Sequence, residues 1–353
     1  MDFVSDRIRK LSPYTSGEQT EYIIKLNTNE NPYPPSPRIN ELLKSIEISN
    51  LKRYPNQTSE RLRNALATKY KVKPDMIFVG NGSDEILALL HFAFFDDIKE
   101  NIAYPDVTYS LYLVYDDLFK NKTYNPPLND DFTLDLTNYE DLDVKGYIFA
   151  NPNAPTSIAI PATVIEDFII KHRDKLVIID EAYIDFCNES VVGLTLKYDN
   201  LLVVQTFSKG YSLAGIRCGY AIGNSKLIEG LNIVKDCFNN YPIDYITEQI
   251  AIEAVLDEQY YRDINAKVVL TRERVIGAMR KMGFNVLNSS SNFIFASHNS
   301  YPAVEIYKKL KEKKILVRHW NKEKISNYLR ISVGTDAEMD LLLENMSKIL
   351  NAK

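Results

Sequence analysis

The chain has 353 residues, of which 45% are hydrophobic and 25% charged, as is usual for a globular protein of one large or two moderate domains. A net charge of -5 without a basic stripe disfavours nucleic-acid binding. No apolar run approaches the roughly 20 residues of a membrane span, and the N-terminus lacks a signal-peptide core. The three cysteines form no closely spaced pair and the four histidines lack metal-ligand spacing, so the sequence indicates neither a disulfide framework nor a metal site. A cytoplasmic location is therefore expected.

Residues 1–40 are expected to form an N-terminal arm. The segment is polar, with a short strand predicted at Tyr22–Leu26 and a proline-rich run from Pro32 to Pro37. An arm of this length needs a surface to lie on. We expect it to join the small domain of its own chain or a dimer interface.

Residues 41–240 alternate between apolar strand patterns and helical patterns, which predicts a large α/β domain. Strands are expected at Met76–Val79, Asn101–Tyr104, Lys145–Ala150, Leu176–Ile179 and Leu201–Val204. Helices are expected at Ser59–Tyr70, from Asp84 to about Phe95, at Tyr109–Leu118 and at Ile160–His172. Continuous apolar strands separated by helices are typical of a mostly parallel sheet with helices on both faces.

The pattern of residues 241–353 predicts a smaller α+β domain. The pattern changes near Asn239–Pro242, after which helices become longer and strands fewer. Helices are expected at Thr247–Leu256, Ile264–Met282, Ala303–Lys313 and Asp336–Leu350, and strands at Asn292–Ala296, Ile315–Arg318 and Tyr328–Val333.

Polar motifs follow several of the predicted strands of the large domain. They are Gly80–Asp84, Asn151–Ala154, Asp180–Tyr183 and Ser208–Lys209. Ligands of parallel sheets bind beyond the carboxyl ends of the strands, so these motifs predict one shared site.

The motif Gly80–Asp84 is a candidate anion site, because glycines before a helix let free backbone N–H groups approach a phosphate. The third glycine of a dinucleotide fingerprint is missing after Gly80 and Gly82, which argues against a nicotinamide-dependent oxidoreductase.

Lys209 lies just past a buried strand, between hydroxyls and glycines, which is an unusual place for a packing residue. A desolvated lysine beside another cation loses its proton readily and can form a Schiff base with an aldehyde cofactor. Arg217 could supply that cation and hold a phosphate. Asp180 ends a neighbouring strand and could keep a pyridine nitrogen protonated, and Tyr183 could donate to a phenolate oxygen.

These motifs resemble a known family. Asp180–Tyr183, Ser208–Lys209 and Leu213–Tyr220 resemble the fold-type-I, pyridoxal-phosphate-dependent aminotransferases. Further segments, Arg9–Tyr14, Leu26–Pro32, Arg53–Pro55 and Tyr328–Gly334, are most similar to the histidinol-phosphate aminotransferases. The resemblance implies pyridoxal 5'-phosphate as cofactor and a fold-type-I large domain.

The resemblance also implies residue roles. Lys209 would carry the internal aldimine and shuttle a proton, Asp180 would hold the pyridine nitrogen, and Tyr183 the phenolate. Tyr109 would stack on the ring. The phosphate would be surrounded by Gly82, Ser83, Asp84, Thr206, Ser208 and Arg217.

Substrate binding and a second subunit follow from the same resemblance. Arg330 would clamp a substrate carboxylate, with Tyr14, Glu30 and Arg318 near the rest of the substrate. Tyr54 would reach the cofactor phosphate from the other subunit, which implies a homodimer with shared active sites.

The chain departs from the family pattern in one loop. Ala154 stands where the family has an asparagine that bonds the phenolate oxygen, Asn153 directly precedes it, and Ser157 replaces a glycine. Either Tyr183 holds the phenolate alone or with water, or Asn153 turns in to replace the missing amide.

The resulting expectation is ping-pong transamination between histidinol phosphate and 2-oxoglutarate in histidine biosynthesis. Alternatives on the same scaffold are an aromatic amino acid aminotransferase and a threonine-phosphate decarboxylase. A non-catalytic protein that binds pyridoxal phosphate is an alternative of another class. A cofactor-sensing transcription regulator would need a DNA-binding module, for which residues 1–40 are too short and too rich in proline.

Overall fold

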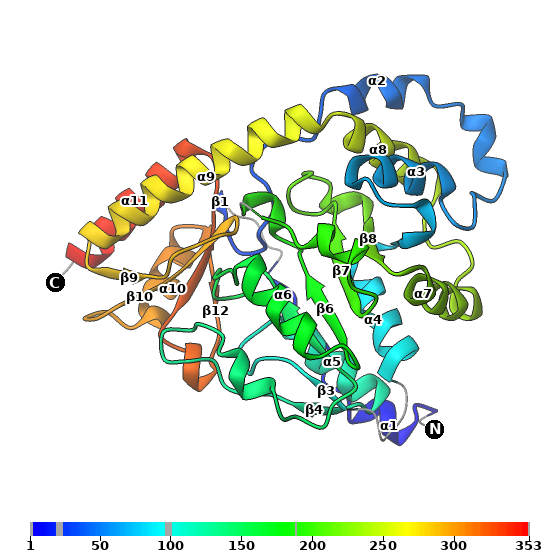
Figure 1. Ribbon diagram of the computed structural model, residues 1–353. Helices are drawn as coiled ribbons and strands as arrows, with labels where there is room; N and C mark the ends of the chain where they lie inside the picture. Colours follow the sequence, from blue (N-terminus) through cyan, green and yellow to red (C-terminus); the bar gives the residue numbers. More distant parts are fainter. Residues whose placement is uncertain (1–2, 19–23, 96–100, 188, 352–353) are drawn as a thin grey trace.

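The computed structural model describes residues 3–18, 24–95, 101–187 and 189–351. Within these residues, seven strands form the central sheet of the large domain (Figure 1). Their order across the sheet is β2 (Ile77–Gly80), β8 (Gly219–Gly223), β7 (Leu201–Thr206), β6 (Leu176–Asp180), β5 (Gly146–Ala150), β3 (Asn101–Ala103) and β4 (Lys122–Tyr124). The mostly parallel sheet predicted from the sequence is confirmed, since β4, β3, β5, β6 and β7 pair in parallel.

Two strands of this sheet were not predicted. β8 runs antiparallel between β2 and β7. It has glycine at both ends of its five residues, and glycine is depleted in strands, which weakens the strand pattern in the sequence. β4 is an edge strand with two exposed residues and no apolar run. Because β8 is antiparallel, its start rather than its end lies beside the carboxyl ends of the other strands.

Helices cover both faces of the sheet, as expected. Alternate side chains of one strand enter different cores: Val177 and Ile179 lie in one, and Ile178 lies in the other. The first core includes residues of α3 (Glu60–Tyr70), α6 (Ala162–Lys171) and α8 (Tyr245–Leu256). The second includes residues of α4 (Gly82–Phe95), α5 (Leu111–Phe119) and the unpredicted α7 (Ser225–Phe238). The central strands are therefore apolar at consecutive positions of the sequence, because both of their faces are buried.

The small domain contains an antiparallel sheet with helices packed against it. The strand order is β12 (Arg318–His319), β13 (Leu329–Ser332), β10 (Phe293–His298) and β9 (Phe284–Val286). Its core also takes residues from α9 (Glu258–Lys281), α10 (Ala303–Glu312) and α11 (Asp336–Asn351). The first turns of α9 pack in the large-domain core and its later turns in the small-domain core, so this helix joins the two domains.

The strand predicted at Ile315–Arg318 is in fact two short strands with different partners. β11 (Ile315–Leu316) pairs in parallel with β1 (Ile24–Lys25) of the arm, whereas β12 pairs with β13. The change of partner at Val317 brings Arg318 into register opposite Arg330.

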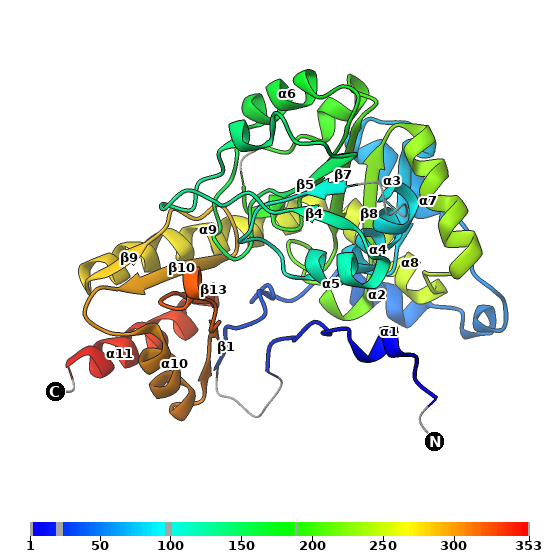
Figure 2. The ribbon, with the colours of Figure 1, turned by 90° about the horizontal axis from the view of Figure 1, so that it is seen from below.

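The N-terminal arm contacts both domains. Figure 2 shows α1 (Asp6–Arg9) beside the large domain and β1 beside the small one. Arg7 donates a hydrogen bond to the Leu118 carbonyl at 2.8 Å. The arm ends in α2 (Arg38–Ser45), and residues 22 and 23 of the predicted arm strand lie outside the described residues. The domain boundary expected at residue 240 stays a prediction; α8, which follows it, packs on α2 and α3.

None of the helices in the described ranges has the length and apolarity needed to cross a lipid bilayer.

Candidate active site

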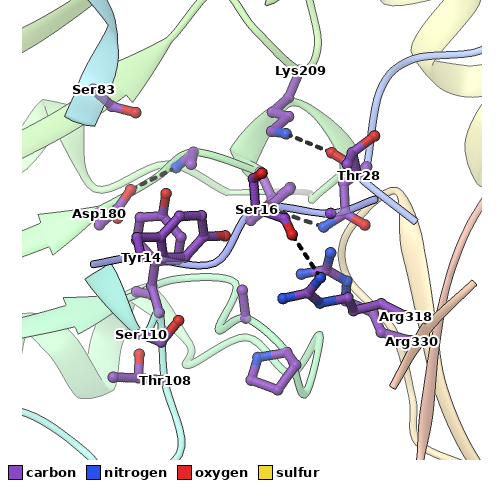
Figure 3. A pocket seen from close by; sticks show the side chains of 18 of the residues that line it. Tyr14, Ser16, Thr28, Ser83, Thr108, Ser110, Asp180, Lys209, Arg318 and Arg330 are labelled. Atoms are coloured by element: carbon purple, nitrogen blue, oxygen red, sulfur yellow. Dashed lines mark hydrogen bonds between the residues drawn. The ribbon is translucent and has the colours of Figure 1, made fainter. Parts of the chain in front are cut away.

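A cavity of about 390 Å³ lies between the strand ends of the large sheet, the arm and strands β12 and β13. Figure 3 shows that Lys209 and Asp180 come from the large domain, Tyr14 and Thr28 from the arm, and Arg318 and Arg330 from the small domain. Most residues singled out in the sequence line this cavity: Tyr14, Glu30, Ser83, Asp84, Tyr109, Asp180, Tyr183, Thr206, Ser208, Lys209, Arg217, Arg318 and Arg330.

Three expected residues do not line the cavity. Gly82 lies directly behind it, because a Cβ atom built there would sit 2.6 Å from Arg217 Nη2, and its φ of +82° suits glycine. Tyr54 is 82% exposed and stacks on Tyr241 with 4.8 Å between ring centroids. Asn153 lies in the adjoining loop.

One end of the cavity forms a cup for an anion at the first turn of α4. Arg217 donates to Ser208 Oγ at 3.3 Å and to an Asp84 carboxylate oxygen at 3.3 Å. The Ser208 amide donates to Thr206 Oγ1 at 3.1 Å. A Cβ at Gly219 would lie 2.5 Å from the Ser83 nitrogen, so this glycine lets β8 approach the helix start. Hydroxyls, a guanidinium and helix N–H groups therefore converge, as a phosphate requires.

Lys209 extends from the loop after β7 into the cavity. Its Nζ donates to the Thr28 carbonyl at 3.1 Å and lies 5.7 Å from the centre of the Tyr183 ring. Burial, and then the positive charge of Arg330, lower the pKa of Lys209 to about 8. The amine can therefore lose its proton near neutral pH and act as a nucleophile.

Asp180 ends β6 and faces the cavity with both carboxylate oxygens held. Oδ2 accepts a hydrogen bond from the Tyr112 hydroxyl at 2.6 Å, and Oδ1 accepts one from the Ala182 amide at 3.1 Å. Burial raises the pKa of Asp180 to about 6, and these two hydrogen bonds oppose the rise. A carboxylate held in this way is suited to accept a proton or to pair with a cationic ring nitrogen.

Aromatic rings form one wall of the cavity near Asp180. Tyr109 meets Tyr112 and Tyr14 edge to face, at centroid distances of 5.6 and 6.0 Å. Its hydroxyl donates to Asp84 at 3.0 Å, which fixes the ring. A flat ligand ring fits such a wall.

The loop that departs from the family pattern is held by its own hydrogen bonds. The Asn153 amide nitrogen donates to the Val107 carbonyl at 3.0 Å and to Thr156 Oγ1 at 2.9 Å, and its oxygen accepts from Thr108 at 2.8 Å. The side chain thus has a structural role where it lies, and its expected contact with a cofactor stays a prediction.

A different amide lies at the Tyr183 hydroxyl. Asn29 Nδ2 donates to the Tyr183 oxygen at 3.0 Å. Asn29 is 1% exposed, has a φ of +56°, and is fixed by hydrogen bonds with Ser332 and Asn292. Since the Tyr183 oxygen accepts this bond, its own hydrogen remains free to point at a ligand.

Two arginines define the end of the cavity formed by the small domain. Arg330 donates to the Asn27 carbonyl at 2.9 Å, and its Nε is buried without a partner among the described residues. Burial lowers the pKa of the Arg330 guanidinium. Arg318 donates to the Thr15 carbonyl at 2.9 Å. It also donates to the Ser16 carbonyl at 3.0 Å (Figure 3). Both cations have spare donors for an anion.

Glu30 belongs to the arm and lines the cavity, where its charge acts on Lys209. Although burial alone would raise it, hydrogen bonds from Lys25 and Thr28 hold the pKa of Glu30 below its usual value. Glu30 is therefore ionised at neutral pH and contributes a negative charge near the amine of Lys209.

Asn29, Tyr112 and Trp320 also contribute to the site and were not singled out in the sequence. Tyr112 donates to Asp180, and Trp320 lines the cavity. Tyr112 follows Tyr109 by three positions and Trp320 follows Arg318 by two, so each is close in sequence to a residue that was singled out. That proximity was the available signal. Asn29 had none, because its partners lie far along the chain.

Comparisons with known proteins agree with this geometry. The sequence profile of the family described as aminotransferase class I and II matches residues 21–346. A protein of Brachyspira hyodysenteriae named histidinol-phosphate aminotransferase is 48% identical, over 99% of this chain and 99% of its own. One of the same name from Clostridium beijerinckii is 45% identical, over 98% of this chain and 97% of its own.

Solved structures share the fold. Histidinol-phosphate aminotransferase from Sinorhizobium meliloti, in complex with pyridoxal-5'-phosphate, has a TM-score of 0.90 at 21% identity, covering 100% of this chain and 98% of that chain. L-threonine-O-3-phosphate decarboxylase from Porphyromonas gingivalis has a TM-score of 0.79 at 21% identity, covering 93% and 99%. Because the profile spans nearly the whole chain and the relatives match it end to end, the protein belongs to the class I and II aminotransferase family.

Proposed function

We propose that this protein transfers the amino group of histidinol phosphate to 2-oxoglutarate. The observation that carries the proposal is the match to relatives of that name, which are 42–48% identical over essentially the full length of both chains. The cavity supports it through two arginines that line its small-domain end and offer spare donors.

The residues present fit pyridoxal 5'-phosphate, the cofactor of this aminotransferase family. The cup beside Gly82 has donors for a phosphate, Asp180 is a buried carboxylate for a ring nitrogen, and Lys209 is a buried amine of lowered pKa. When bound, the cofactor acts as an electron sink for the α-carbon of the substrate.

The proposed roles follow from where each side chain lies. Arg217, Ser208, Thr206 and the first turn of α4 bind the cofactor phosphate, and Tyr109 covers the ring. Asp180 keeps the ring nitrogen protonated, and Tyr183 donates its free hydrogen to the phenolate oxygen. Lys209 carries the cofactor, and its amine moves a proton to and from the substrate α-carbon.

Arg330 and Arg318 bind the anionic groups of both substrates. Histidinol phosphate presents a phosphate and no carboxylate, whereas 2-oxoglutarate presents two carboxylates. The same arginines therefore accept a phosphate in one half-reaction and a carboxylate in the other, which planar guanidinium donors allow. Tyr14 and Glu30 lie close enough to contact the rest of the substrate.

A homodimer in the cytoplasm completes the proposal. Tyr54 is exposed, as are the apolar side chains of Ile48, Leu51 and Phe238. A second subunit would cover these side chains and bring its own Tyr54 to the cup. Size measurement of the purified protein, and loss of cofactor affinity in Tyr54→Phe, would support this assembly.

The test of function is formation of glutamate by the purified holoenzyme from histidinol phosphate and 2-oxoglutarate. Parallel reactions contain phenylalanine as amino donor, or O-phosphothreonine with detection of carbon dioxide. Glutamate from histidinol phosphate at the highest kcat/KM supports the proposal. Absence of glutamate, or faster turnover in a parallel reaction, contradicts it.

A further inference from the structure

Trp320, the single tryptophan of the sequence, lies against the guanidinium groups of both cavity arginines. The centre of its ring is 5.4 Å from Arg318 Cζ and 5.2 Å from Arg330 Cζ. It follows Arg318 by two positions and lies one residue past the end of β12. Trp320 also lines the cavity and is half-buried.

The two arginines stand in an arrangement that is unfavourable by itself. Arg318 and Arg330 are directly opposite each other across the antiparallel pair β12–β13, where like charges repel. Their hydrogen bonds in this structure go to the carbonyls of Thr15, Ser16 and Asn27. No carboxylate of the described residues forms an ion pair with either. The fold therefore holds two unneutralised cations together at the cavity wall.

An aromatic ring within about 6 Å of two guanidinium groups offsets part of their repulsion, because the ring quadrupole attracts both. Phe293 adds a second ring to Arg330, 5.5 Å from its Cζ. Among the rings of the described residues, Trp320 is the one at cation–π distance from both arginines, so it contacts the two at once.

We propose that Trp320 is a positioning residue that holds Arg318 and Arg330 as one receptor for a dianionic group, and thereby sets the preference for phosphate over carboxylate. Two guanidinium forks match the charge and oxygens of a phosphate monoester, whereas a single carboxylate engages one fork fully. The choice of a phosphorylated substrate rests on the proposed function. The pairing of the arginines through Trp320 rests on the geometry alone.

The first test uses the fluorescence of the unmodified holoenzyme, in which bound cofactor excludes phosphate from the cup. Inorganic phosphate is titrated at constant ionic strength, with acetate in parallel. We expect a saturable change in tryptophan emission that phosphate produces at about tenfold lower concentration than acetate. A change that requires equal concentrations of both anions, or no change with phosphate, overturns the proposal.

The second test compares Trp320→Leu with Trp320→Phe, which keeps an aromatic face. The readout is the phosphate concentration that gives half of the maximal rise in thermal unfolding temperature. We expect about tenfold weaker phosphate binding in the leucine variant and a change within about twofold in the phenylalanine variant. Tyr307→Leu is the matched control, because Tyr307 stacks on the neighbouring His319 at 5.7 Å and does not line the cavity.

Phosphate binding by Trp320→Leu as tight as in the wild type overturns the proposal. If that variant does not fold, the phosphate titration of the unmodified chain still tests the proposal. With histidinol phosphate as substrate, KM should rise by the same factor as the phosphate constant while kcat stays within about twofold. If phosphate binding depends on the ring but histidinol phosphate is not a substrate, the proposed function fails and this inference stands.

Discussion

The cofactor side and the substrate side of the cavity are assembled in different ways. On the cofactor side, Asp180 is the last residue of β6, and Ser83 and Lys209 each come three residues after a strand of the same sheet, β2 and β7. On the substrate side, Arg330 bonds the Asn27 carbonyl across 303 positions of sequence, and Arg318 bonds the Ser16 carbonyl across 302. The first side depends on the ends of neighbouring strands, and the second on docking of an arm against a separate domain.

The two sides also differ in their charge balance. Arg217, at the cup, has Asp84 as a partner at 3.3 Å. Arg318 and Arg330 have backbone carbonyls as their partners. Substitutions on the cofactor side should therefore act on the chemical step, and those on the substrate side on the apparent affinity for anionic substrates.

The largest effect is expected from Lys209→Ala. Turnover should fall by more than about 10⁴-fold, because the variant loses both covalent attachment of the cofactor and the group that moves the proton. Mass spectrometry of the borohydride-reduced wild type should place the cofactor on Lys209, and the variant should show no adduct. Lys324→Ala is the control, since Lys324 lines the cavity but is paired with Asp106 at 3.1 Å. An adduct on another residue would refute the assignment.

Asp180→Asn should lower kcat by about 10²-fold while the cofactor stays bound, because a neutral amide cannot keep the ring nitrogen protonated. The matched control is Glu181→Gln. Glu181 is equally buried but faces away from the cavity, where it accepts bonds from Ser190, Val191 and Gln205. Equal loss of rate in both variants would mean that Asp180 acts through folding rather than chemistry.

Arg330→Gln should raise KM for both substrates by roughly 10- to 100-fold, with a smaller change in kcat, because each substrate loses a charge-assisted pair. Steady-state kinetics with each substrate varied in turn measure the effect. A KM that rises for one substrate alone would show that the two substrates do not share this arginine.

The sequence predicts the cofactor side well because that side is local. A buried strand followed by a polar residue places that residue at the carboxyl edge of a parallel sheet, whichever strands are neighbours. This logic predicted the lining residues Ser83, Asp180 and Lys209. It applies less well to Arg217, which precedes the antiparallel β8, and the resemblance to the family supplied its role instead.

The substrate side could not be derived in the same way. Whether Arg318 opposes Arg330 depends on the change of strand partner at Val317, and no local pattern marks it. Likewise, the loop departure at Ala154 directed attention to Asn153, whose amide is used within its own loop. The amide found at Tyr183 is Asn29, which reaches it across 154 positions of sequence.

A smaller effect is expected from Tyr112→Phe, which tests how the cofactor side is supported. Loss of the 2.6 Å bond to Asp180 should lower kcat by about tenfold, since a hydrogen bond to a buried carboxylate contributes roughly 1.5 kcal/mol. Tyr104→Phe is the control, because the Tyr104 hydroxyl donates to Asp116 instead. If both variants retain full rate, the bond from Tyr112 does not tune Asp180.

The smallest effect concerns the pH at which apoenzyme takes up cofactor. The pKa of Lys209 is lowered to about 8, so the neutral amine needed for attachment becomes the major form above that pH. Uptake, followed by absorbance and corrected for the titration of free cofactor, should rise about tenfold per pH unit below 8 and level off above it. An ordinary lysine would keep the rate rising to about pH 10.4. Because the charge of Arg330 contributes to the lowered pKa, Arg330→Gln should move the midpoint upward, which would show that the substrate side acts on the amine of the cofactor side. An unchanged midpoint in this variant would mean that Arg330 does not act on the amine and that the two sides are electrostatically independent.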